Sequence, residues 1–125
     1  MGNVAVRQVL ERALALIRLG WTQGLFARDD RGRDVSSCHS RAVCWCLMGA
    51  VRRAAFDLWP ELGAVTWAGL LDDTTRALVS VVPPEQLTAG LSPGDQLIGW
   101  NDNRQRTVAE VYGVLVSAIE VQPLC

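Results

Sequence analysis

The sequence predicts a mainly α-helical single domain over residues 1–125, with about four main helices and a small β-hairpin after the first helix. A chain of 125 residues, half of them apolar, has the size and composition of one domain with one core. Several stretches repeat apolar residues every three or four positions, as amphipathic helices do. A charged, glycine-punctuated stretch follows the first of these and favours the hairpin.

The first helix is expected over residues 4–19. Asn3 is a suitable N-cap, and Gly20 can adopt the left-handed conformation that ends a helix. Arginines occupy the opposite side from the apolar stripe, so the helix has one face for the core. The stripe comprises Val6, Val9, Leu10, Ala13, Leu14 and Ile17.

Residues 21–35 are expected to form the hairpin, with Gly32 at a left-handed turn position. The charged stretch from Arg28 to Gly32 lies between the apolar pair Leu25-Phe26 and Val35. Within it, Arg28 and Asp29 are expected to form an intramolecular ion pair rather than a ligand clamp.

Three further helices follow in the prediction. Ser40 is the expected cap of a helix that ends near Phe56, and a third helix is expected from Thr66 to Val82, where two prolines stop it. Residues 83–104 are rich in proline and glycine and are expected to be irregular apart from a turn near Glu85.

The last helix begins at Thr107, which forms a capping box with Glu110. Just before it, the Gly99–Asn103 segment is expected to form an Asx-type turn, with Trp100 as its apolar anchor.

Composition and charge limit the partners and the cellular location expected for this protein. All twelve basic residues are arginine, which favours forked contacts with carboxylates or phosphates. The net charge of −1 and the lack of a basic run give no electrostatic footprint for nucleic acid, so none is expected as a partner. No apolar run is long enough to cross a bilayer, and the arginines of the first helix interrupt any secretory signal. We therefore expect a cytoplasmic protein without a membrane partner.

The four cysteines are expected to be free thiols, because they lack the spacing of a disulfide framework. Cys44 and Cys46 are two positions apart on the expected second helix and would face different ways, so no metal site is predicted. No cofactor motif is present, and none is expected.

A cysteine-dependent hydrolase or transferase is the alternative function. Cys46 or Cys44 would be the thiolate, His39 the base, and Asp102 or Asn101 the group that orients the imidazole. His39 is the sole histidine, but it lies near the start of the same expected helix, which limits its reach. A solvent-exposed histidine is the structural interpretation.

Polar and aromatic residues from two distant segments are expected to meet at one pole of the domain. If the first and last helices pack antiparallel, the end of one lies beside the start of the other. The cluster would be either a rigid structural knot or a binding surface. Its members are Trp21, Arg28, Asp29, Trp100, Asn101 and Asp102, and the candidate binding residues are these six together with Gln23.

Several short motifs along the chain resemble those of a known protein family. They are Gly20-Trp21-Thr22-Gln23-Gly24, Ala27-Arg28-Asp29 with Gly32, Cys46-x-x-Gly49-Ala50, Trp100-Asn101-Asp102, Thr107-x-x-Glu110-Val111 and Ala118-Ile119. Together they resemble a family of small uncharacterised bacterial and phage proteins that is classed as a domain of unknown function. The resemblance implies a common fold and shared polar and aromatic positions, but no activity. His39 lies outside the pattern and Cys46 lies within it.

The preferred functional hypothesis is a non-enzymatic protein-interaction module, of the kind that phage or mobile elements use to modify a host complex. Five tryptophans and many arginines in a small domain support it, because both residue types are frequent anchors at interfaces. The expected partner is another protein. Accelerated alkylation of one cysteine at low pH would favour the enzyme instead.

Overall fold

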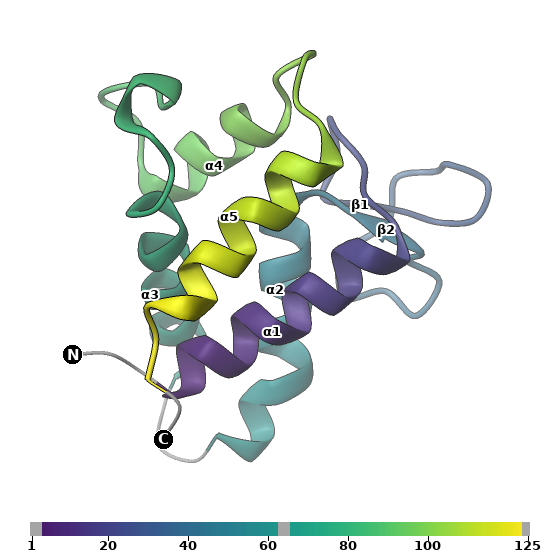
Figure 1. The fold of residues 1–125 in the computed structure, drawn as a ribbon. Coiled ribbons are helices and arrows are strands. Elements are labelled where there is room, and N and C mark those ends of the chain that lie inside the picture. Colours follow the sequence, from purple (N-terminus) through teal and green to yellow (C-terminus); the bar gives the residue numbers. More distant parts are fainter. Residues whose placement is uncertain (1–3, 63–65, 124–125) are drawn as a thin grey trace.

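A computed structural model describes residues 4–62 and 66–123 of the chain (Figure 1). Its elements are α1 (Val4–Leu19), β1 (Ala27–Arg28), β2 (Cys44–Trp45), α2 (Leu47–Leu58), α3 (Trp67–Val79), α4 (Pro93–Asn101) and α5 (Val108–Glu120), with 3₁₀ turns at Trp59–Glu61 and Pro84–Gln86. The predicted mainly α-helical class, with a small two-stranded sheet after the first helix, is confirmed. No helix in the described ranges is long and apolar enough to cross a bilayer.

Helix α1 lies at the centre of the core, because α2, α3 and α5 all pack against it. Its apolar stripe is buried as the three-to-four spacing predicts. Figure 1 shows α1 and α5 side by side, with α5 beginning near the end of α1. The antiparallel packing expected from the sequence is therefore present. The predicted N-cap, Asn3, lies outside the described residues.

Both ends of α5 are closed by side chains. At its start, Thr107 Oγ1 accepts a hydrogen bond from the Glu110 backbone N–H (3.3 Å), and the Glu110 carboxylate accepts one from the Thr107 N–H (2.9 Å). This is the predicted capping box. At its end, the Arg7 guanidinium donates to the carbonyl oxygens of Ile119 (2.9 Å) and Gln122 (3.2 Å), and the Ile119 carbonyl also accepts from the Gln122 N–H (3.0 Å).

The pairing of β1 differs from the expected hairpin within residues 21–35. Strand β1 pairs antiparallel with β2, with Ala27 opposite Trp45, and residues 29–43 form the loop between the strands. Of the expected hairpin, an isolated antiparallel bridge joins Arg28 to Asp34, and hydrogen bonds from the Asp29 N–H to the Arg33 carbonyl (3.0 Å) and from the Val35 N–H to the Ala27 carbonyl (3.3 Å) accompany it. The distant pairing prevails because it buries both Ala27 and Trp45 in the core. Gly32 does adopt the predicted left-handed conformation, with φ of 75°.

Helix α2 begins at Leu47 rather than at Ser40, which lies exposed in the loop. Cys46 is the N-cap, and its sulfur accepts a hydrogen bond from the Gly49 N–H (3.2 Å). Because Cys44 pairs with β1, the helix can start only after β2. The two cysteines therefore do not share a helix, and the prediction that both lie on the second helix is wrong.

The stretch 83–104, expected to be irregular, contains helix α4. Ser92 caps it by accepting from the Asp95 N–H (3.2 Å), and Pro93 occupies its first turn, where a missing N–H costs nothing. Trp100 and Asn101 form the last turn of this helix, and the expected Asx-type turn follows at Asn103, whose Oδ1 accepts from the Gln105 N–H (2.9 Å). Helix α3 begins after Thr66, which is its N-cap rather than its first residue, and ends at residue 79, three positions short of the prediction.

Candidate interaction site

The buried side chain of Asn101 joins three segments of the chain. Its Oδ1 accepts from the Trp21 indole N–H (2.7 Å) and from the Leu47 backbone N–H (3.0 Å). Its Nδ2 donates to the carbonyl oxygen of Thr22 (3.2 Å) and to Asp102 Oδ1 (3.0 Å). An amide offers two donor hydrogens and two acceptor lone pairs, so the hydrogen-bonding capacity of this side chain is used inside the protein.

Gln23 and Asp102 extend this network to the surface. Gln23 Nε2 donates to the carbonyl oxygens of Asn101 (2.8 Å) and Asn103 (2.7 Å), which lie at the C-terminal end of α4. Asp102 Oδ1 also accepts from the Gly24 N–H (3.0 Å). We call Trp21, Thr22, Gln23, Asn101 and Asp102 the knot. It ties the segment after α1 to the end of α4 and the start of α2.

Trp100 does not hydrogen-bond within the knot. Its indole N–H donates to the Gln86 side chain (2.9 Å), and its ring stacks against the Arg106 guanidinium, 4.0 Å from the ring centroid. Successive residues of a helix point about 100° apart, so Trp100 and Asn101 face different neighbours. Trp100 thus anchors the Pro84–Gln86 turn to the end of α4.

Arg28 supports the knot from β1, but it does not pair with Asp29 as expected. Its guanidinium donates to Thr22 Oγ1 (2.8 Å) and to the carbonyl oxygens of Gln23 (3.0 Å) and Gly32 (3.1 Å). Consecutive residues of extended backbone point to opposite sides, which separates the Arg28 and Asp29 side chains. Asp29 forms its ion pair with Arg33 instead, at 2.8 Å.

Asp29 is buried and organises the first part of the 29–43 loop. Its carboxylate accepts from the backbone N–H groups of Arg31 and Arg33 (both 2.9 Å) and from Arg33 Nε. The backbone hydrogen bond from Arg33, followed by its side chain and by the Arg31 N–H, holds the Asp29 pKa below its ordinary value against the opposing effect of burial. The charged form of Asp29 is therefore the one that fits this loop.

The alternative catalytic residues do not form a catalytic arrangement. Burial raises the pKa of the Cys46 thiol to about 11, and the nearby negative charge of Asp102 contributes. The exposed His39 ring accepts from the Arg41 N–H (3.0 Å). Across the described ranges, no hydrogen bond connects His39 to Cys44, Cys46 or Asp102, and no three His, Cys, Asp or Glu side chains are placed to hold a metal ion.

A pocket of about 270 Å³ opens beside the knot, and we call it the knot pocket. Its apolar wall comes from Leu25, Phe26 and Ile98, and its polar groups include the Asp34 and Asp102 carboxylates. Neither carboxylate forms an ion pair within the described residues. The lining consists of Gly24, Leu25, Phe26, Asp34, Cys46, Ile98 and Asp102.

Sequence analysis identified Asp102 and Cys46 but missed the pocket's apolar residues and Asp34. Ile98 and Asp102 are four positions apart at the end of α4, a spacing that places them on one helix face. That signal was present in the sequence but could be used only if residues 93–101 were recognised as helical. No sequence pattern near Asp34 predicts that this residue lines the knot pocket.

Comparison with other proteins places the chain in a family but gives no activity. A protein-family model matches residues 1–121, almost the whole chain, and its description is a family of unknown function. No curated protein and no solved structure matches the chain.

Proposed function

The chain belongs to the family of unknown function DUF6197, and we propose that it is a cytoplasmic, non-enzymatic interaction protein that holds a basic side chain of a partner protein in the knot pocket. The observation that carries this proposal is an apolar pocket with two carboxylates that lack ion-pair partners within the described residues. Pockets of mainly apolar lining with a few convergent polar groups are typical binding sites.

The lining suits arginine or lysine in particular. The aliphatic stem of such a side chain packs on Leu25, Phe26 and Ile98, while its charged head reaches Asp34 or Asp102. Hydrogen bonds between a cation and a carboxylate are stronger than those between neutral groups.

The knot supports binding by holding the pocket in shape. Asp102 is fixed by the Gly24 N–H and by the Asn101 amide, so one wall is in place before a ligand arrives. A preorganised site loses less conformational entropy on binding. The knot residues thus contribute to the site by positioning it, since most of their polar groups are bonded internally.

The enzymatic alternative receives less support from the same pocket. Its thiol, Cys46, has a raised pKa and is protonated at neutral pH, whereas a cysteine nucleophile needs its thiolate. A buried, protonated sulfur that caps α2 fits a structural role.

Affinity capture from the native host tests the proposal with charge-removing variants. In Asp102→Asn the amide oxygen can still accept from Gly24 and Asn101, so the fold is retained while the charge is lost. We expect a protein captured by the wild type to be lost with Asp102→Asn and Asp34→Asn but retained with the exposed control Asp73→Asn. Identical capture by all four proteins, with equal melting temperatures, would contradict the proposal.

A further inference from the structure

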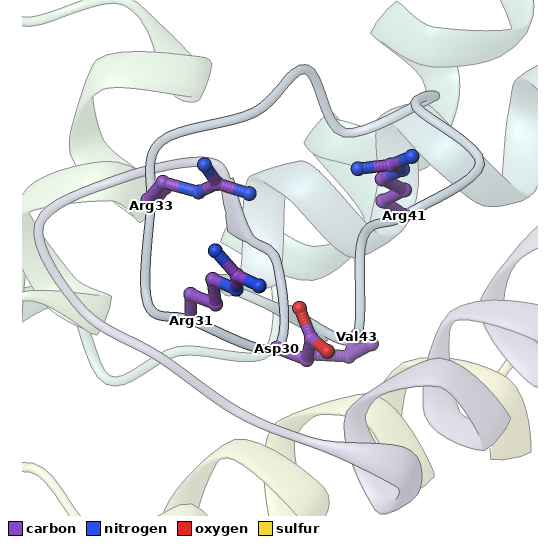
Figure 2. Close-up of a pocket in the computed structure, with 5 residues that line it drawn as sticks. All are labelled: Asp30, Arg31, Arg33, Arg41 and Val43. Atoms are coloured by element: carbon purple, nitrogen blue, oxygen red, sulfur yellow. The ribbon is translucent and has the colours of Figure 1, made fainter.

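The loop between β1 and β2 encloses a second hollow, of about 490 Å³, which we call the arginine hollow. Figure 2 shows the side chains of Asp30, Arg31, Arg33 and Arg41 directed toward the same space, with Val43 at its edge. All three arginines are exposed, and none belongs to the knot or lines the knot pocket.

The guanidinium groups of this hollow have donors to spare. Across residues 4–62 and 66–123, the side chains of Arg31 and Arg41 have neither a hydrogen bond nor an ion pair. Arg33 uses only Nε, which donates to Asp29, so both of its terminal nitrogens remain available. Three guanidiniums with available donors around one space form a site for an anion.

The backbone that carries these arginines is held at several points. The Asp29 N–H donates to the Arg33 carbonyl (3.0 Å), and the Val43 N–H donates to the Arg28 carbonyl (2.9 Å). From α2, Arg53 donates to carbonyl oxygens in the loop at Ser37 and His39. The loop is therefore a fixed frame for its arginines.

The charge in and around the hollow indicates which anion fits. The three arginines of the hollow are opposed by Asp30, which also lines it, and by Asp29, which is bonded to Arg33, so the net charge of these five side chains is +1. One carboxylate neutralises that charge. A phosphate group carries about −1.5 to −2 at neutral pH and would leave excess negative charge beside Asp30.

A neighbouring depression favours a peptide segment over a free ion as the source of the carboxylate. Arg33 and Arg41 also line this depression, and so does Asp34, which lines the knot pocket as well. This depression therefore adjoins both the arginine hollow and the knot pocket, although those two have no lining residue in common. We propose that the arginine hollow binds a carboxylate side chain of an acidic protein segment. The proposal uses different side chains from the knot pocket and can be tested separately.

Titration of the ¹⁵N-labelled full chain with a capped tetraglutamate peptide tests the proposal. We expect saturable shifts in the backbone amides of residues 30–43 and in the Nε–H signals of Arg31 and Arg41. A capped tetraglutamine peptide should cause none, and inorganic phosphate should bind more weakly. Arg31→Gln and Arg41→Gln should each weaken peptide binding about tenfold, the size expected for one charged hydrogen-bonding contact. The exposed Arg18→Gln is the matched control.

A gain-of-binding variant complements these losses. Asp30→Asn raises the net charge of the same five side chains from +1 to +2, so we expect it to bind phosphate more tightly than the wild type does. Three results would overturn the proposal: no saturable shift with tetraglutamate, an equal weakening by Arg18→Gln, or tighter binding of phosphate than of the peptide to the wild type. Loss of the knot-pocket partner with intact peptide binding would count only against the proposed function.

Discussion

Asn101 shows how a single polar residue can hold three chain segments in place. Replacing it with leucine keeps the approximate size of the side chain but removes the partners of the Trp21 indole N–H, the Leu47 N–H and the Thr22 carbonyl. Each buried polar group left without a partner costs about 1–3 kcal/mol. We expect Asn101→Leu to lower the free energy of unfolding by at least about 3 kcal/mol, measured by urea denaturation.

The exposed neighbour Asn103 provides the control for that substitution. Its side chain accepts one hydrogen bond, from the Gln105 N–H, at the surface. Asn103→Ala should change the free energy of unfolding by no more than about 1 kcal/mol. Equal losses for the two variants would show that the Asn101 network is not a principal support of the fold.

Cys46 should be the least reactive of the three described cysteines. Its pKa of about 11, against an ordinary value of 9.0, corresponds to an about 100-fold smaller thiolate fraction near neutral pH. We expect iodoacetamide to modify the half-buried Cys38 and Cys44 first, as followed by mass spectrometry of digested protein. Asp102→Asn should lower the Cys46 pKa, because it removes a nearby negative charge.

The raised pKa also sets a direction for alkaline stability. The folded state holds the Cys46 proton more tightly than the unfolded state, so its contribution is complete below pH 9 and is lost as pH rises toward 11. Rapid modification of Cys46 at low pH would instead support the hydrolase or transferase alternative.

At the scale of elements, Gly49 lets β1 approach α2 closely. A Cβ atom at this position would overlap the carbonyl oxygen of Phe26, which accepts from the Cys46 N–H. We expect Gly49→Ala to destabilise the protein by about 1–3 kcal/mol, the usual cost of overpacking, in a denaturant titration.

Gly113 is the matched control, since it also lies within a helix but has open space where its Cβ would be. Alanine there should stabilise the protein by about 0.5–1 kcal/mol, because glycine loses more backbone entropy in a helix. A destabilising Gly113→Ala or a neutral Gly49→Ala would disagree with the packing described here.

The start of α5 depends on its capping box. Thr107→Ala removes the acceptor of the Glu110 N–H and should cost about 1 kcal/mol of stability by thermal or urea denaturation. Thr88→Ala, at an exposed position outside the helices, should have little effect. An unchanged denaturation midpoint for Thr107→Ala would mean that this cap contributes nothing to α5.

At the scale of the whole molecule, Arg7 connects the first helix to the last. Replacing it with methionine keeps an apolar stem but leaves the carbonyl oxygens of Ile119 and Gln122 without their guanidinium donor. We expect a loss of about 1–2 kcal/mol for Arg7→Met in urea denaturation, because hydrogen bonds from a charged donor are among the stronger ones. The exposed Arg18→Met should be close to neutral, and equal effects would argue against this connection.

Some residues of the candidate sites were predicted from the sequence and others were not. Sequence motifs pointed to Trp21, Asn101 and Asp102 and to their meeting at one pole, which follows once α1 and α5 pack antiparallel. Asp34 and Arg41 were missed, because their positions depend on the path of the loop between β1 and β2. The arginines of the arginine hollow and the carboxylates of the knot pocket keep polar groups available for a partner. Most polar groups of the knot are bonded internally.

The sequence by itself determined α1, α5 and the presence of α3, together with the cap at Thr107. Apolar spacing and capping are local properties, so a few neighbouring residues specify them. Only the tertiary structure decided that β1 pairs with β2, which set the start of α2 at Leu47. It also decided that Asn101 ends a helix and bonds inward. A two-residue strand and one buried amide have too few local contacts to specify themselves, and their partners come from distant parts of the chain.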